Sequence, residues 1–213
     1  MDKRSYGRRF RRFIRAYNVQ VGQEYSSAKS GPGSKHGRFT KPLVDFLVQF
    51  IHDNNISSMV EASSGHWRSG WQSHVSWPNI VYHGIDQNLS VIRDNQLLLE
   101  GRTDKFGFLE ASFNTGNMIE DDLPSADLLF TKDTLIHFSN TDMEKFFLLH
   151  RTRYKYILCV HDGLMSNETE TRDVNTGDWR RIQLSAPPFN LPTKEVFRYP
   201  AQRGRPKIIE LLS

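Results

Sequence analysis

The stretch ISSMVEASSGHW, residues 56–67, decides the fold of this 213-residue chain. Its apolar run from Ile56 to Val60 has the length of a buried strand, and Glu61 follows it directly. The small residues 62–65 then make a turn between this strand and the next element. A strand that leads into a turn of small residues is typical of the strand-turn-helix units that build parallel sheets.

Four further apolar runs have the length of strands: Ile80 to Ile85, Phe106 to Leu109, Ala126 to Phe130 and Tyr156 to Val160. Other stretches have helical periodicity: Lys41 to Asp53, Leu89 to Leu99 and Asp142 to Arg151. This alternation predicts an α/β protein with a twisted, mainly parallel sheet that has helices on both faces. Val196 to Tyr199 and Lys207 to Leu212 predict an antiparallel strand pair that flanks a turn at residues 203–205.

The length of the chain allows one sizeable domain, and we expect residues 29–213 to form it. Hydrophobic residues make up 38% and charged residues 24% of the chain, which excludes wholesale disorder and fibrous repeats. No apolar run approaches the roughly 20 residues of a membrane-spanning helix. Cys159 is the single cysteine and the histidines lack the spacing of metal ligands, so we expect no disulfide and no metal site.

The positive charge is concentrated at the start of the chain, because residues 1–40 hold ten Lys and Arg against two acids. We expect residues 1–28 to be a basic helical segment whose apolar face holds Phe10, Phe13, Ile14 and Tyr17. We favour docking of this face on the domain; the alternative is that residues 3–15 bind RNA. We expect a cytoplasmic protein, although an Arg-rich start is also compatible with organelle targeting.

Acidic residues stand at or just after the ends of four predicted strands: Glu61, Asp86, Asp133 and Asp162. The carboxyl ends of parallel strands line the ligand crevice of an open sheet, so we expect these acids to surround one site. The alternative for any single one is that it caps a helix or starts a loop.

The turn after Glu61 and the acid Asp86 together have the arrangement of a nucleoside site. Small residues let a ligand approach the backbone, and an acid at the tip of the next strand accepts hydrogen bonds from both ribose hydroxyls. Only Gly65 lies in the turn, so the three-glycine fingerprint of dinucleotide-binding proteins is absent, as is a Walker loop.

In these motifs the sequence resembles the class I S-adenosylmethionine-dependent methyltransferases, and within them a poorly characterised group with a late Trp-Arg and Pro-Pro-Phe-Asn-Leu-Pro signature. The matching stretches are residues 30–34, 60–67, 84–86, 123–129, 132–137, 179–180 and 184–192. The resemblance implies a Rossmann-like fold with a seven-stranded sheet and S-adenosyl-L-methionine as cofactor. It implies cofactor-binding roles for Glu61, Ser63, Gly65, Trp67, Asp86 and Lys132, and Glu110 and Ser112 compete for the position that faces the adenine amino group.

The loop departs from the family pattern at two positions. Ser63 stands where the family has the first glycine of its loop, and His66 stands where it has aspartate. If residue 63 adopts a positive φ, a serine there costs of order 1 kcal/mol. These departures leave room for a homologue that keeps the fold without catalysis.

Methyl transfer to a hydroxyl or amine benefits from a base, and Asp133 and His137 are the candidates. The alternative is that Asp133 caps a turn and that His137 is structural. We expect residues 164–192 to cover the acceptor side, with Trp179 lining the pocket and Arg180 contacting an anionic acceptor or the cofactor carboxylate. The alternative for this pair is that Trp179 packs on the sheet and Arg180 pairs with a structural acid.

The resemblance therefore implies S-adenosylmethionine-dependent methyl transfer to an unidentified small-molecule or macromolecular acceptor. Two alternatives stay open. One is a non-catalytic protein that keeps the fold and binds the cofactor or a partner. The other is an RNA methyltransferase that uses the basic amino-terminal helix.

Overall fold

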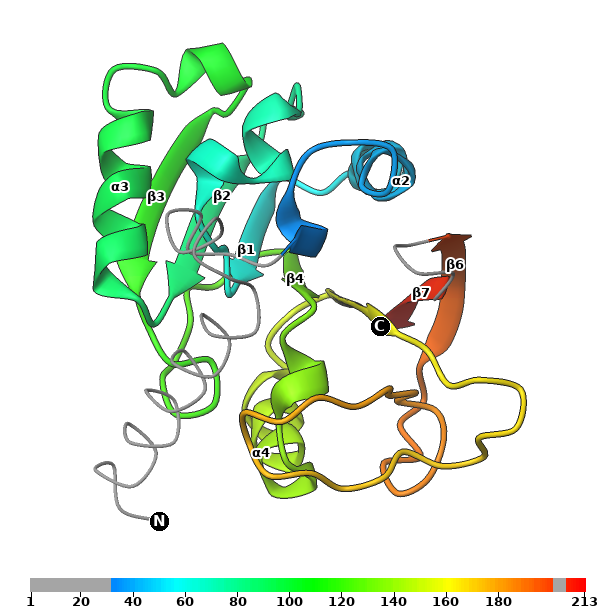
Figure 1. The fold of residues 1–213 in the computed structure, drawn as a ribbon. Coiled ribbons are helices and arrows are strands. Elements are labelled where there is room, and N and C mark those ends of the chain that lie inside the picture. The colour runs from blue at the N-terminus through cyan, green and yellow to red at the C-terminus, as the bar shows by residue number, and fades with distance from the viewer. Residues whose placement is uncertain (1–31, 201–205) are drawn as a thin grey trace.

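The computed structural model describes residues 32–200 and 206–213. The described strands are β1 (Ser58–Ala62), β2 (Val81–Asp86), β3 (Glu110–Thr115), β4 (Leu128–Lys132), β5 (Tyr156–Asp162), β6 (Lys194–Pro200) and β7 (Pro206–Leu212). They form one sheet in the order β3-β2-β1-β4-β5-β7-β6 (Figure 1). Strands β1 to β5 are parallel, and β7 is antiparallel to both of its neighbours. The predicted mainly parallel sheet and its antiparallel strand pair are confirmed, whereas the basic segment 1–28 and the turn at residues 203–205 lie outside the described residues.

Helices cover both faces of this sheet. The described helices are α2 (Lys41–Asp53), α3 (Leu89–Leu99) and α4 (Asn140–His150), and the short 3-10 turns are η2 (Pro32–Ser34), η3 (Trp67–Ser69), η4 (Trp71–His74), η5 (Asp104–Phe106) and η6 (Leu135–His137). Side chains of α2, α3, η3 and η4 share one core cluster with one face of the sheet. Those of α4 and η6 share a second cluster with the other face. No helix in the described parts of the chain has the length and apolar character needed to cross a membrane.

The helices form where local signals specify them. The apolar spacing of α2 buries Leu43, Leu47 and Ile51, and each such side chain contributes about 2 kcal/mol by its removal from water. The side chain of Asn88 caps α3 by accepting hydrogen bonds from two backbone N–H groups of the first turn. Both helices have the predicted bounds. Helix α4 begins two residues earlier than predicted, because Ser139 caps it.

The strand predicted at residues 106–109 is wrong. Phe106 and Phe108 are buried against the rings of Trp67 and Trp77, and Gly107 between them has a φ of 87°, which ends any extended run. The third strand begins instead at Glu110, which pairs with Val81 at the start of β2. The apolar run therefore reflects an aromatic cluster and not a strand.

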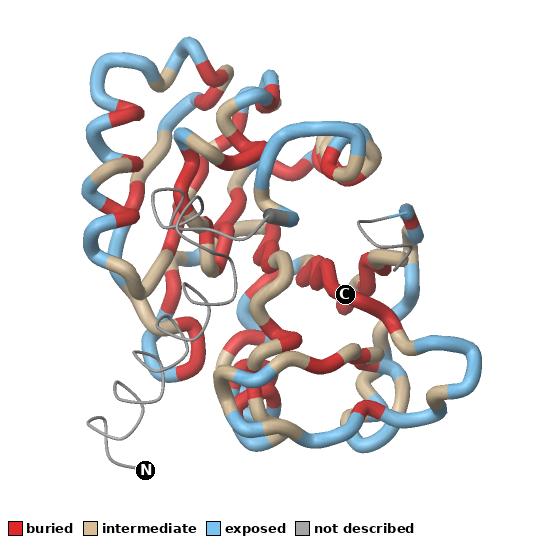
Figure 2. Tube along the Cα trace, viewed as in Figure 1, coloured by how far each residue is buried: buried red, intermediate tan, exposed pale blue. Residues whose placement is uncertain are grey.

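A long connection joins β5 to β6. Residues 163–193 contain no helix or strand, and Figure 2 shows most of this loop as exposed or intermediate, in contrast to the buried strands. Ile182 and Leu184 are its fully buried anchors in the second core cluster. The loop leaves the sheet at Asp162, at the carboxyl edge of the parallel strands.

Candidate functional site

The carboxyl ends of the parallel strands meet at one edge of the sheet. The registers align Ala62 at the end of β1 with Ile85 of β2 and with Thr131 of β4. Three of the four predicted acids lie at this edge, because Asp86 and Asp162 end their strands and Asp133 follows β4 directly. This edge is the candidate site.

The loop that follows β1 is held tightly against β2 and α3. Ser63 and Gly65 have φ values of 66° and 61°, so the condition for strain at Ser63 is met. The backbone N–H of Gly65 donates to Oδ2 of Asp86 at 3.0 Å. Asn95 of α3 is fully buried; its amide donates to the carbonyl of Gly65 at 2.7 Å and accepts from the N–H of Trp67 at 2.9 Å. The loop geometry is thus fixed by contacts on both sides.

Asp86 is oriented by backbone donors on both of its oxygens. Besides the contact with Gly65, its Oδ1 accepts from the N–H of Asn88 at 2.9 Å. Burial raises the pKa of Asp86, although the backbone hydrogen bonds lower it in part. The carboxylate keeps further lone pairs, which are suited to the hydroxyl donors of a ribose.

Glu61 faces the interior of the fold and is only 2% exposed. It accepts hydrogen bonds from the hydroxyl of Tyr82 at 2.5 Å and from the amide of Gln72 at 2.8 Å. The same amide donates to the carbonyl of Ser64 at 2.9 Å, so Glu61 supports the loop through Gln72. Burial raises the pKa of Glu61 to about 7, although the bonds from Tyr82 and Gln72 lower it. Neither Tyr82 nor Gln72 is predicted from the sequence, because Tyr82 stands within an apolar strand run and Gln72 stands outside the predicted elements.

Three residues of the predicted cofactor set have side chains that are buried or that lie before the carboxyl end of their strand. Trp67 is fully buried, and its ring packs on Tyr82 and Phe113. Glu110 is at the amino end of β3, and Ser112 lies in mid-strand, where its hydroxyl contacts His83 at 2.9 Å. Both were placed by the wrong strand prediction. Thr115 is the residue of β3 that pairs with Asp86, so the position after the third strand is Gly116.

A second group at the edge is an ion cluster of Lys132, Asp133, Asp162 and Lys207. The ammonium of Lys132 contacts Oδ2 of Asp133 and donates to the carbonyl of Gly33 at 3.0 Å. The ammonium of Lys207 contacts Oδ1 of Asp133 and lies 2.8 Å from Oδ1 of Asp162. Burial alone raises the pKa of Asp133, but the charges of Lys132 and Lys207 outweigh it and hold this pKa well below its usual range. Asp133 is therefore a permanent anion and a poor proton acceptor.

His137 lies in η6, one turn after Asp133. Its Nδ1 is 3.0 Å from the carbonyl oxygen of Asp178, which only accepts, so Nδ1 carries the proton and donates. Burial lowers the pKa of His137, and the charges of Asp133 and Asp162 raise it in part. The ring is thus neutral near pH 7, and Nε2 is its basic nitrogen.

Trp179 and Arg180 differ in their surroundings within the long loop. The indole N–H of Trp179 donates to Oδ2 of Asp162 at 3.3 Å, which links this residue to the ion cluster. Arg180 is fully buried; its guanidinium donates to the carbonyl of Arg172 at 2.7 Å and contacts the amide oxygen of Asn140. Burial lowers the pKa of Arg180 to about 10, although the charge of Asp173 raises it. This environment favours a structural role for Arg180.

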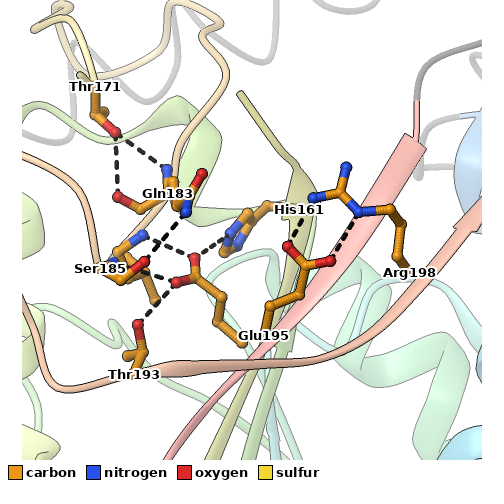
Figure 3. A network of polar contacts seen from close by, with 9 residues as sticks. His161, Thr171, Gln183, Ser185, Thr193, Glu195 and Arg198 are labelled. Atoms are coloured by element: carbon orange, nitrogen blue, oxygen red, sulfur yellow. Dashed lines mark hydrogen bonds and ion pairs between the residues drawn. The ribbon is translucent and has the colours of Figure 1, made fainter. Parts of the chain in front are cut away.

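The far end of the loop is fastened to β7 by Glu210. Its carboxylate accepts from His161 at 2.9 Å, from the hydroxyl of Thr193 at 2.7 Å and from the N–H of Leu184 at 2.7 Å and of Ser185 at 3.2 Å. Figure 3 shows that His161, Ser185 and Thr193, which come from different parts of the chain, lie around one network of polar contacts. The loop over the edge is therefore fixed at both ends.

No described group of three or more His, Cys, Asp and Glu side chains is arranged to hold a metal ion. His66 contacts the hydroxyl of Ser69, and the ring of His74 stacks on that of His36. The site is organised around carboxylates, lysines and a histidine.

Many solved structures share this fold, and the three described next are methyltransferases. Mitomycin 7-O-methyltransferase MmcR aligns with a TM-score of 0.54 and 16% identity over 74% of this chain and 49% of that one. Magnesium protoporphyrin IX methyltransferase from Synechocystis PCC 6803, solved with bound SAH, aligns with a TM-score of 0.56 and 10% identity over 98% and 94%. The methyltransferase domain of bacterial CtHen1 aligns with a TM-score of 0.58 and 11% identity over 83% and 100%.

These similarities define the class of fold: the chain has the Rossmann-like fold of class I methyltransferases, with the expected seven-stranded sheet. The chain spans about half the length of the mitomycin enzyme. No protein-family model and no curated protein matches the sequence.

Proposed function

We propose that this protein binds S-adenosyl-L-methionine at the carboxyl edge of its sheet and transfers the methyl group to an unidentified acceptor. The observation that carries the proposal is the carboxylate of Asp86 at the end of β2, fixed by the N–H of Gly65 from the loop after β1. A nucleoside that lies across the ends of β1 and β2 would contact the oriented carboxylate of Asp86 and the backbone of the loop at Gly65.

The residues at the edge fit the chemistry of this cofactor. Asp86 offers acceptors for two ribose hydroxyls, and Gly65 has no side chain to obstruct the approach. Gly116 lies beside Asp86, because its N–H donates to the carbonyl of Asp86 at 3.1 Å, and it too has no side chain to obstruct a ligand. On the other side, the side chain of Lys132 is 7% exposed and its ammonium is paired with Asp133, so Lys132 adds positive charge beside the methionine part while it stays bound to that carboxylate. Ser63 and Lys132 would then flank the amino-acid portion.

When bound, the cofactor supplies an electrophilic methyl group on a sulfonium, and the protein aligns an acceptor with it. Asp133 stays ionised, and its paired lysines keep it from accepting a proton. His137, neutral with its proton on Nδ1, is the better base, and Nε2 takes the proton that a hydroxyl or amine acceptor loses. The carbonyl of Asp178 holds this tautomer in place.

A specific observation also supports the non-catalytic alternative. Ser63 occupies a left-handed backbone position that favours glycine, so the loop reaches its shape at an energetic cost, and a loop that departs from the glycine pattern in this way fits weaker cofactor binding without turnover. Binding and turnover therefore need separate tests. Any contribution of residues 3–15 to RNA recognition is a further alternative that the same tests address.

The binding test is titration calorimetry with S-adenosylhomocysteine and S-adenosylmethionine. We expect binding by the intact protein, and Asp86→Ala raises the dissociation constant by about 10- to 100-fold, because it removes charge-assisted hydrogen bonds. Asp53→Ala, at a carboxylate that is 57% exposed on α2, is the matched control and leaves binding unchanged. Absence of binding by the intact protein contradicts the proposal.

The turnover test uses methyl-labelled cofactor with small-molecule, protein and RNA fractions of a cell extract. We expect label in one fraction and its loss with His137→Gln, which keeps cofactor binding. Label in the RNA fraction that disappears on deletion of residues 1–17 supports the RNA methyltransferase alternative. Cofactor binding without labelling of any fraction supports the non-catalytic alternative.

A further inference from the structure

A groove of about 720 Å³ lies along β3, the outer strand of the sheet, whereas the ion cluster belongs to β4, β5 and β7. Residues of α3 and β3 line its two sides, and in Figure 1 these two elements form one margin of the fold. The lining residues of α3 include Arg93, Gln96, Leu97 and Glu100. Among the described strands, β3 pairs only with β2, so its other edge faces this groove.

The groove is better suited to a helix than to an added strand. The side-chain amide of Gln96 donates to the backbone carbonyl of Phe113 at 2.7 Å. An added strand would need this carbonyl, in the middle of β3, as a hydrogen-bond acceptor, but Gln96 already occupies it. The side chain of Gln96 also lies over the strand edge. A partner in the groove therefore contacts the side of α3 that lines it. We call this side of the helix, which carries Arg93, Leu97 and Glu100, the outward side of α3.

The outward side of α3 is self-complementary. Arg93, Leu97 and Glu100 stand at positions i, i+4 and i+7, so they share one face of the helix. Leu97 is 64% exposed, and within residues 32–200 and 206–213 neither Arg93 nor Glu100 forms an ion pair. The two charges lie about 10 Å apart along the helix, on either side of the leucine.

A two-fold axis at Leu97 uses all three residues at once. When two copies of α3 lie antiparallel across this axis, Leu97 of one copy meets Leu97 of the other. Arg93 then faces Glu100 of the second copy, and Glu100 faces its Arg93. In an isologous contact of this kind the ion pair between Arg93 and Glu100 forms twice, once on each side of the axis, and the dimer is closed.

We propose that this groove is a homodimer interface in which α3 of one copy packs antiparallel against α3 of a second copy. The occupant of the groove is a second copy of this chain, because α3 is complementary in charge to an antiparallel copy of itself: Arg93 of each copy faces Glu100 of the other. The inference stands on the outer edge of the sheet and does not depend on cofactor binding or methyl transfer.

The experiment is light scattering coupled to size-exclusion chromatography on the full chain, with sedimentation equilibrium for the dissociation constant. We expect a mass of twice 24.7 kDa for the unaltered protein. Leu97→Asp yields the monomer mass. Leu148→Asp is the matched control, since Leu148 is 75% exposed on α4, and it leaves the dimer intact.

The charge pairs give a second and sharper test. Arg93→Glu and Glu100→Arg each weaken the dimer by about tenfold or more, since each places like charges opposite each other. The double variant R93E/E100R restores the pairs in reversed order and recovers the original dissociation constant. Circular dichroism checks that each variant is folded. A monomeric unaltered protein, or a dimer that Leu97→Asp and the single charge reversals leave unchanged, overturns the proposal.

Discussion

The ammonium of Lys207 lies 2.8 Å from Oδ1 of Asp162, although the two residues belong to antiparallel strands and face the carboxyl edge of the parallel ones. Their side chains are 12% and 11% exposed, and the same ammonium also contacts Asp133. A strand that lies outside the parallel part of the sheet therefore supplies a charge to the candidate site.

We predict that Lys207→Met lowers the free energy of unfolding by about 3 kcal/mol, because it leaves the buried Asp162 and Asp133 with less compensation. Lys41→Met is the matched control, since the Lys41–Asp45 pair is 70% and 60% exposed and contributes less than about 1 kcal/mol. Urea unfolding followed by circular dichroism measures both. Equal effects of the two substitutions would show that the ion cluster adds no stability beyond that of a surface pair.

Glu61 predicts a dependence of stability on pH. Its pKa is raised in the folded protein from 4.5 to about 7, so the folded state binds more protons between these values. The stabilisation is complete below about pH 4.5 and is lost as the pH rises to about 7, with a maximum of roughly 3 kcal/mol. Glu61→Gln removes this contribution. Unfolding free energies of both proteins across this range test it, and a difference that does not change with pH contradicts it.

Ser63 predicts that a glycine is the better residue at the start of the loop. Ser63→Gly raises the free energy of unfolding by up to about 1 kcal/mol, because it relieves the strain of a positive φ. Ser64 is not among the residues with positive φ, so Ser64→Gly lowers stability by about 0.5 to 1 kcal/mol through the greater freedom of the unfolded chain. Thermal unfolding of the two variants checks these opposite signs. A loss of stability in both would show that Ser63 makes contacts worth more than its strain.

We predict that substitution of Arg180 lowers the stability of the protein and does not selectively lower its activity. Arg180→Ala removes a buried guanidinium that holds the carbonyl of Arg172 and the side chain of Asn140, and we expect a destabilisation of about 2 to 4 kcal/mol. Arg151→Ala, at an exposed position after α4, is the control and changes stability little. Differential scanning calorimetry measures both melting temperatures. A normal melting temperature of Arg180→Ala would contradict the structural role and favour the alternative that Arg180 contacts the acceptor or the cofactor.

Local patterns predicted the helices well. Helices α2 and α3 have the predicted bounds because apolar spacing and the Asn88 cap act over a few residues. The same kind of reasoning was wrong at residues 106–109, because an apolar run indicates burial without saying whether the backbone is extended. The aromatic rings around Trp67 bury this run as a turn.

The candidate site was predicted only in part. The placement of Asp86, Asp133 and Asp162 at one edge was predicted because strand ends can be recognised in the sequence, and parallel topology brings these ends together. Lys207 was not predicted to lie at this edge, because it is 74 residues from Asp133 in the sequence. It stands near the start of an antiparallel strand, whereas the prediction considered only the ends of parallel strands. Glu61 was assigned to the cofactor, whereas its partners Tyr82 and Gln72 turn it into the interior.

Local patterns in the sequence are enough to predict the order of the elements, the mainly parallel sheet and the edge at which polar side chains gather. The availability of those side chains depends on the folded chain: Asp133 is paired with two lysines, Asp86 is oriented by backbone donors, and Arg180 is buried in its own loop. The physical reason is that periodicity and caps depend on neighbours in the chain, whereas charge pairing and burial depend on groups that only the folded sheet brings together.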